Sequence, residues 1–116
     1  MRIFIADLAY LNDNNYSTPL PLNAGFVASY VLKHLPVDIK IFKDPNKLLD
    51  AFNEKFPDVL ALSGYIWNLN LNLAIAKHCK KINPNLKIIM GGPNFKYEDP
   101  QWVESFFTAN PFIDIF

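Results

Sequence analysis

The chain has 116 residues, of which 51% are hydrophobic and 15% aromatic, which suits one domain with a packed core. Eleven Lys and Arg balance eleven Asp and Glu, so the formal net charge is zero. This balance argues against a nucleic-acid-binding surface or a polybasic membrane contact, since both need excess positive charge. The single cysteine, Cys79, excludes an intramolecular disulfide and any thiolate-bound cluster. Neither a signal peptide nor a transmembrane run is recognisable, so we expect a cytoplasmic protein.

The first part of the chain alternates between strand and helix patterns. Residues 3–6 form a short apolar run that ends at Asp7, as a buried strand does. A long polar segment follows, and from 22 to 35 apolar residues recur at helical spacing until Pro36. Residues 37–42 then alternate in polarity, which indicates a half-buried strand at the edge of a sheet.

The same alternation continues through the middle of the chain. Asp44–Pro45 predicts an N-cap with proline at the first helical position, opening a helix that runs to residue 56. Residues 59–62 are continuously apolar, which is typical of a strand buried on both faces. A helix over 70–82 and a second buried strand over 86–90 follow.

The last part of the chain repeats these signals once more. Asp99–Pro100 predicts another capped helix, Asn110–Pro111 ends it, and residues 112–116 read as a final strand. The order βαβαβαβαβ predicts the α/β class: a flavodoxin/Rossmann-like three-layer αβα fold with a five-stranded parallel sheet in the order 2-1-3-4-5, its last helix missing. We therefore expect the first domain of a longer protein. The alternative is a complete small protein that forms a homodimer through its uncovered sheet face.

Small and polar residues gather where this topology places a ligand. In open parallel sheets ligands bind at the carboxyl ends of the strands, where the strand order reverses, which here means between the first and third strands. The segments at that rim are 7–9, 63–68 and 91–94. A glycine after a strand often marks only a turn. Two adjacent glycines beside a Ser-Gly pair on the neighbouring strand instead favour a flat groove that admits a ligand against the backbone.

Three segments carry a resemblance to a known family. The stretch Pro57-Asp-Val-Leu-Ala-Leu-Ser-Gly-Tyr-Ile-Trp-Asn68, the turn Asn83-Pro-Asn85 and the triplet Gly91-Gly-Pro93 resemble the N-terminal cobalamin-binding domain of B12-dependent radical SAM enzymes. The similarity covers residues 1–116, as a cobalamin-binding-like Rossmann domain, and residues 112–114 match a strand of that family. It implies that cobalamin is the ligand of this chain and that a radical SAM domain lies downstream.

The resemblance also implies a set of site residues. They are Asp7, Ser63, Gly64, Tyr65, Trp67, Asn68, Gly91, Gly92 and Pro93. The serine and the two adjacent glycines would contact the nucleotide tail of cobalamin. Tyr65, Trp67 and the loop from Tyr10 to Leu22 would wall the lower face of the corrin, although the two aromatic residues could equally pack the start of the third helix.

Two motifs of the wider family are missing. Methionine-synthase-like cobalamin domains carry Asp-x-His-x-x-Gly after the first strand, but Ala9 stands where that histidine would be, and His34 and His78 lie in helical patterns away from the rim. The Cys-x-x-x-Cys-x-x-Cys motif is also absent, so S-adenosylmethionine and a [4Fe-4S] cluster would belong to the downstream domain. We therefore predict no catalytic or metal-ligating residue in this chain, and methyltransferase-type chemistry for the longer protein.

The same fold also supports other functions. The alternative reading is a degenerate interaction module that binds no cofactor and docks a partner domain through its uncovered fifth strand. A receiver domain needs an aspartate where Ser63 stands, and a flavodoxin needs a Ser/Thr-rich phosphate loop where residues 19–22 stand. A dinucleotide site needs Gly-x-Gly-x-x-Gly after the first strand, and that motif is absent.

Overall fold

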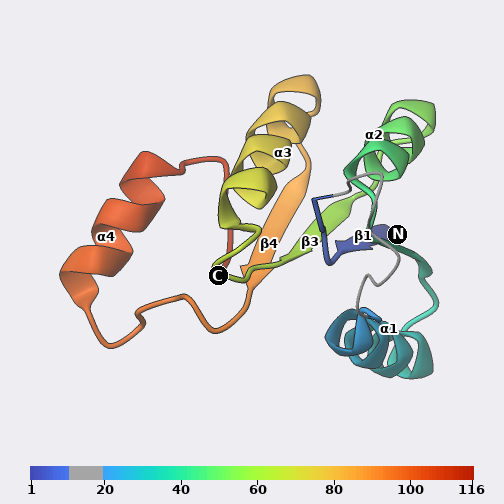
Figure 1. The fold of residues 1–116 in the computed structure, drawn as a ribbon. Helices are drawn as coiled ribbons and strands as arrows, with labels where there is room; N and C mark the ends of the chain where they lie inside the picture. The colour runs from blue at the N-terminus through green and yellow to red at the C-terminus, as the bar shows by residue number, and fades with distance from the viewer. Residues whose placement is uncertain (11–19) are drawn as a thin grey trace.

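The computed structural model describes residues 1–10 and 20–116, and its secondary structure alternates between strand and helix (Figure 1). The elements are β1 (Arg2–Ala6), α1 (Leu22–His34), β2 (Asp38–Phe42), α2 (Pro45–Glu54), β3 (Val59–Ser63), α3 (Leu69–Ile82), β4 (Lys87–Gly91) and α4 (Pro100–Ala109). The strands are parallel, in the order β2-β1-β3-β4. The predicted α/β class, the edge position of β2 and the reversal of strand order between β1 and β3 are confirmed.

Two helix starts follow the predicted capping chemistry. The Asp44 carboxylate accepts the backbone N–H groups of Asn46 and Lys47, at 2.8 and 3.4 Å, and begins α2. The Asp99 carboxylate accepts the N–H of Trp102 at 3.0 Å and begins α4. Helices α1 and α3, which follow the two strands at the reversal point, begin without such a side-chain bond. Among the described residues no helix is long and apolar enough to cross a membrane.

The core lies mainly on one face of the sheet. The larger cluster joins strand side chains such as Phe4, Leu60 and Ile88 to Phe52 of α2 and Ile75 of α3. In Figure 1, α2 and α3 lie on one side of the strands and α1 on the other. Burial of this cluster is the main stabilising contribution, since each fully buried large apolar side chain is worth about 1.5–3 kcal/mol.

Helix α1 packs on the opposite face with small residues. Its buried residues are Ala24 and Ala28, which form a second, smaller cluster with Ile5 of β1. The larger apolar residues whose spacing predicted the helix, including Phe26 and Tyr30, are exposed. The helix was therefore predicted correctly, but its apolar period does not mark the side that meets the sheet. On the strands, Ile3, Ile39 and Ala61 pack against this cluster.

The predicted fifth strand is wrong as a strand. The residues after α4 make a single parallel bridge, Ile89 to Ile115, in place of a ladder, so the sheet has four strands among the described residues. The Asp114 carboxylate accepts a hydrogen bond from the Ile88 N–H at 2.8 Å, and the Ile115 carbonyl accepts one from the Met90 N–H at 2.8 Å. A side chain thus replaces one backbone acceptor beside β4, and this limits the pairing to one bridge.

The prediction that β3 and β4 are buried on both faces also needs correction. Leu60 and Leu62 of β3 are buried on the face toward α3, whereas Ala61 and Ser63 on the other face are only half-buried. Strand β4 repeats this, with Ile89 half-buried. Helix α1 contacts β1 and β2, so the face of β3 and β4 beside it is partly open.

Candidate functional site

A groove runs along this partly open face, at the reversal point of the sheet. Its floor is formed by Ile5 of β1, by Ala61, Leu62 and Ser63 of β3, and by Ile89 of β4. Helix α1 supplies one wall, and the segments after β3 and β4 close the carboxyl end. The groove has a volume of about 550 Å³, within the range of about 300–1,000 Å³ typical of small-molecule sites.

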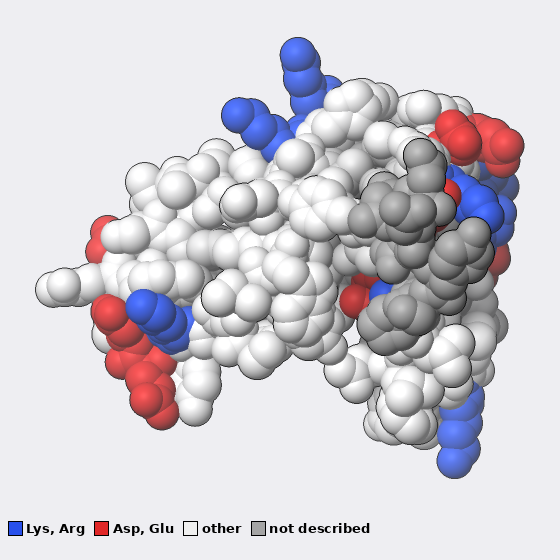
Figure 2. Space-filling model, viewed as in Figure 1, with Lys and Arg blue, Asp and Glu red and all other residues white. Residues whose placement is uncertain are grey.

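The lining of the groove is neutral and mostly apolar. It consists of Ile5, Asn23, Ala24, Val27, Ala61, Leu62, Ser63, Tyr65, Ile89, Gly91, Gly92 and Pro93, none of which is formally charged. Lys, Arg, Asp and Glu gather toward the margins of the view in Figure 2, and most of the described surface between them is uncharged. Such a lining suits a neutral, largely apolar group better than a metal ion, and a charged part of any ligand would lie outside it, because nothing in it neutralises a charge.

The two adjacent glycines have different surroundings. A Cβ atom placed on Gly91 would meet nothing within 4 Å, so this residue leaves open space beside the groove. A Cβ atom on Gly92 would lie 1.9 Å from the Gly64 carbonyl oxygen, and Gly92 has a φ of +143°. Gly92 therefore serves the close approach of two protein segments, and of the two glycines only Gly91 has open space beside it.

Gly64 lies on the other side of that contact. Its N–H donates to the Gly91 carbonyl at 2.5 Å, which extends the pairing of β3 and β4 past the end of the strands. A Cβ on Gly64 would lie 3.2 Å from the same carbonyl oxygen. The structure thus joins Ser63, Gly64, Gly91 and Gly92, which the sequence had placed on two separate segments, into one tight rim.

Tyr65 connects this rim to α1. Its hydroxyl oxygen accepts the Asn23 side-chain N–H at 2.7 Å, across the end of the groove. The Tyr65 and Trp67 rings stack with their centroids 4.5 Å apart and an interplanar angle of 5°. Trp67 is 63% exposed and lies outside the groove lining, on the outer side of Tyr65.

Asn68 and Asp7 occupy the rim without lining the groove. Asn68 is fully buried, and its side chain bonds to backbone groups of the segments around it. The Asp7 carboxylate lies 3.4 Å from the Lys43 ammonium, at the end of β2, which directs it away from β3. Part of the loop predicted to wall the corrin, residues 11–19, lies outside the described residues.

Several groove residues were missed by the sequence analysis. Asn23, Ala24 and Val27 form the α1 wall, and no motif distinguishes them. The available signal was a pair of alanines four residues apart, Ala24 and Ala28, within an otherwise bulky helix. Small residues at that spacing indicate the side of a helix that approaches another backbone closely.

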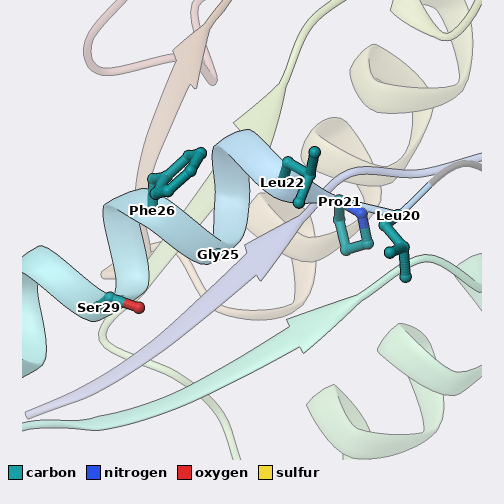
Figure 3. A pocket seen from close by; sticks show the side chains of 6 residues that line it. All are labelled: Leu20, Pro21, Leu22, Gly25, Phe26 and Ser29. Carbon is teal, nitrogen blue, oxygen red and sulfur yellow. The ribbon is translucent and has the colours of Figure 1, made fainter.

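A second, shallower hollow lies on the outer side of α1. It has a volume of about 300 Å³ and is lined by Leu20, Pro21, Leu22, Gly25, Phe26 and Ser29. Figure 3 shows Phe26 and Leu22 projecting from the helix on either side of Gly25. Apart from the serine hydroxyl its side chains carry no polar group, so this hollow offers apolar contact and little directional bonding.

Groups that could bind a metal ion do not meet at the groove. The described residues contain no cluster of three or more His, Cys, Asp or Glu suited to a metal. His34 and His78 are exposed on α1 and α3, as the helical patterns predicted. Burial raises the pKa of the Cys79 thiol to about 12, so it stays neutral within the core.

Comparisons of the sequence identify relatives of one kind. No protein-family model matches the chain. The chain is 32% identical over 102 residues to the 2-(S-pantetheinyl)-carbapenam-3-carboxylate methyltransferase of Streptantibioticus cattleyicolor and, equally, to the cobalamin-dependent radical SAM methyltransferase TokK of Streptomyces tokunonensis. Each match covers 83% of this chain and 14% of the relative. These relatives confirm the resemblance to B12-dependent radical SAM enzymes, and the chain spans about one seventh of their length.

The fold also has a counterpart among solved structures. A crystal structure of a cobalamin-binding protein from Desulfitobacterium hafniense aligns with 99% of this chain and 51% of its own, with a TM-score of 0.62 and 19% sequence identity. At that identity the likeness concerns the fold alone. It confirms the Rossmann-like arrangement of a parallel sheet between helices.

Proposed function

We propose that this chain is a cobalamin-binding domain whose groove between β1, β3 and α1 holds the nucleotide tail of the cofactor. The observation that carries the proposal is the groove itself: uncharged, about 550 Å³ in volume, and placed at the carboxyl ends of β1 and β3. The relative named as a cobalamin-dependent radical SAM methyltransferase supports the choice of cofactor.

Each groove residue has a chemical role in this proposal. The apolar floor, including Ile5 and Ala61, excludes water from the flat base of the tail. The Ser63 hydroxyl would hydrogen-bond to the base, and Gly91 would leave room for the chain that joins the base to the corrin. Tyr65, backed by Trp67, borders the place where the corrin enters.

The chemistry of the longer protein is part of the same proposal. Bound cobalamin supplies a cobalt centre that carries a methyl group. We assign S-adenosylmethionine and the [4Fe-4S] cluster to a radical SAM domain downstream, and methyltransferase-type activity to the whole. The residues described here would bind, orient and shield the cofactor, and the lining of the groove contains no histidine.

The test is a titration of the purified chain with hydroxocobalamin, followed by its visible spectrum and by co-elution in gel filtration. Ser63→Leu and Gly91→Val both place methyl groups in the groove, and we expect each to raise Kd roughly tenfold or more. Gly25→Val is the matched control, because a Cβ at Gly25 also meets nothing within 4 Å but lies on the outer side of α1. Its Kd should equal that of the wild type.

A second ligand tests the assignment of the groove to the tail. Dicyanocobinamide keeps the corrin and lacks the nucleotide base, so it should bind more weakly than cobalamin, and Gly91→Val should affect it little. Equal binding of the two ligands by the wild type would contradict the assignment to the tail. A folded chain that binds neither would contradict the cobalamin proposal as a whole.

A docking module is the second candidate, favoured by the apolar surface of α1. Phe26 is 71% and Tyr30 is 68% exposed, which is unusual for large side chains on a surface helix. The candidate predicts a folded chain that binds no cobalamin and associates with a partner domain through this surface. The described part of the chain holds only one bridge beside β4, so α1 offers the larger contact.

A further inference from the structure

Two buried asparagines lie directly beneath the rim of the groove. Asn68 and Asn72 are both fully buried, on the side of the rim toward α3. Both donate to the Ser63 carbonyl, from their side-chain nitrogens, at 3.1 and 3.0 Å. Asn72 also donates to the side-chain oxygen of Asn68 at 3.2 Å. The two amides therefore act as one hydrogen-bonded pair, which we call the asparagine clasp.

The clasp spans the reversal point of the sheet. The Asn68 side-chain nitrogen donates to the Leu8 carbonyl at 2.9 Å, and its oxygen accepts the Tyr65 N–H at 2.8 Å. One side chain thus connects the segment after β1 with the segment after β3. These two strands border the groove, so the clasp fixes the spacing of the backbone on its two sides.

Asn68 makes these bonds in place of capping α3. It precedes α3 at the N-cap position, where an asparagine commonly accepts N–H groups of the first helical turn. Here it makes no such bond and turns back toward Tyr65 instead. By contrast, Asp44 and Asp99 do cap the helices that begin away from the groove.

Stability alone does not account for Asn72. Its side-chain oxygen is buried without a hydrogen-bond partner among the described residues, which is unfavourable for an amide in a core. A leucine of similar size would avoid that loss. Leucine could not supply the two bonds that Asn72 donates, to the Asn68 side chain and to the Ser63 carbonyl. The second of these holds the last peptide of β3 in one orientation.

We infer that the asparagine clasp positions Ser63 and Tyr65 for binding of the cofactor tail, an inference that rests on the proposed function. With its carbonyl held by two donors, Ser63 presents its side chain to the groove in one direction. With its N–H held by Asn68, Tyr65 is set at the distance from α1 that its 2.7 Å bond with Asn23 requires. Asn68 and Asn72 touch no ligand and are positioning residues.

The test compares affinity with thermal stability in the same chain. Asn72→Leu keeps the branched shape of the side chain and removes its two donated bonds, to the Ser63 carbonyl and to Asn68, so we expect a Tm close to that of the wild type together with a roughly fivefold higher Kd for hydroxocobalamin. Asn68→Ala removes every bond of the clasp except the one from Asn72 to the Ser63 carbonyl, so we expect a lower Tm and a Kd raised roughly thirtyfold or more. Phe52→Leu, in the core under α2, is the control for a lower Tm with an intact clasp, and its Kd should match the wild type.

The results of these measurements distinguish a failure of the inference about the clasp from a failure of the proposed cobalamin site. If the wild type binds hydroxocobalamin and Asn72→Leu binds it equally well, the clasp is structural and the inference is overturned. If Phe52→Leu loses as much affinity as Asn68→Ala at a matched Tm, affinity follows stability and the inference is again overturned. If the wild type itself binds no cobalamin, the proposed function fails first and the clasp has no ligand to position.

Discussion

Two adjacent glycines at the end of β4 perform different tasks. Gly91 borders open space, whereas Gly92 takes a positive φ and brings its backbone against the Gly64 carbonyl. A side chain at Gly92 would meet backbone atoms, which cannot move aside as the end of a flexible side chain can. The rim thus depends on Gly92 for its structure and on Gly91 for its openness.

This difference gives a prediction for stability. Gly92→Ala should lower the free energy of unfolding by about 3 kcal/mol, from the clash with Gly64 and the unfavourable φ. Gly91→Ala, one residue earlier, should change it by less than about 0.5 kcal/mol. Urea denaturation followed by far-ultraviolet circular dichroism measures both variants. Equal losses in the two would show that strand pairing, and not the Gly64 contact, sets the requirement.

The sequence indicated where the residues of the rim lie, but it did not indicate which role each of them has. The rarity of glycine and its position after predicted strands indicated a close backbone approach at Gly64, Gly91 and Gly92. Which atom approaches which residue depends on a contact between segments that are distant in the chain. Asn68 was named on resemblance, and its actual bonds to Leu8 and Tyr65 follow from tertiary structure alone.

At the scale of elements, the segment after α4 shows how a side-chain carboxylate can replace a backbone hydrogen-bond acceptor beside a strand. Asp114 accepts the Ile88 N–H at 2.8 Å and receives the Lys80 ammonium at 2.8 Å, with Lys87 at 3.4 Å. Partial burial raises the pKa of Asp114, but the hydrogen bonds from Lys80 and Ile88 and the two nearby cations outweigh it. The net result is a pKa below its usual value.

The pKa of Asp114 predicts how stability depends on pH. Because the folded-state pKa is lowered, the ionised carboxylate stabilises the fold above its unfolded-state pKa of about 3.9 and loses this effect as pH falls through the lower folded-state value. Asp114→Asn should therefore lower the free energy of unfolding by about 1 kcal/mol at pH 7 and by less at pH 3. Urea denaturation at the two pH values measures the difference.

An exposed acid on α4 provides the control. Glu104→Gln removes the same charge from a surface position, so its effect should be near zero at both pH values. An Asp114→Asn loss that is the same at pH 3 as at pH 7 would show that hydrogen-bond geometry, and not the ionised state, holds this segment to β4.

The wrong prediction of a fifth strand has a physical explanation. The alternation of residues 112–116 is that of a strand, and the segment does lie beside β4. Pattern alone cannot tell that a carboxylate from Asp114 will replace a backbone acceptor. Likewise the period of α1 predicted a helix but not its orientation, because the side that packs on the sheet carries Ala24 and Ala28 and not the larger apolar residues.

At the scale of the whole molecule, the order of elements was predictable because short alternating units leave few arrangements. The described residues form four strands and four helices in alternation, and since connections between parallel strands are right-handed as a rule, this order favours a reversal point between β1 and β3. The groove lies at that point, and so the location of the site could be expected from sequence. The residues that form its α1 wall could not be expected from sequence, because which side of a helix faces the sheet depends on tertiary packing.

The outer surface of α1 leads to a last prediction, about association of the whole chain. With zero net charge there is little repulsion between copies, and Phe26 and Tyr30 project from α1 into solvent. We therefore expect weak, concentration-dependent self-association in sedimentation velocity. The pair Phe26→Glu and Tyr30→Lys lies at i and i+4 on the helix, removes both apolar side chains and leaves the net charge at zero.

In the double variant we expect a monomer at concentrations where the wild type associates, with the free energy of unfolding unchanged within about 0.5 kcal/mol, because neither side chain is buried. Binding of hydroxocobalamin should also be unchanged, since the α1 wall of the groove is formed by Asn23, Ala24 and Val27. A wild type that stays monomeric over the range of protein concentration tested would show that the surface of α1 does not by itself cause self-association. A double variant that associates as strongly as the wild type would move the contact elsewhere, and the partly open face of β3 and β4 would then be the next surface to alter.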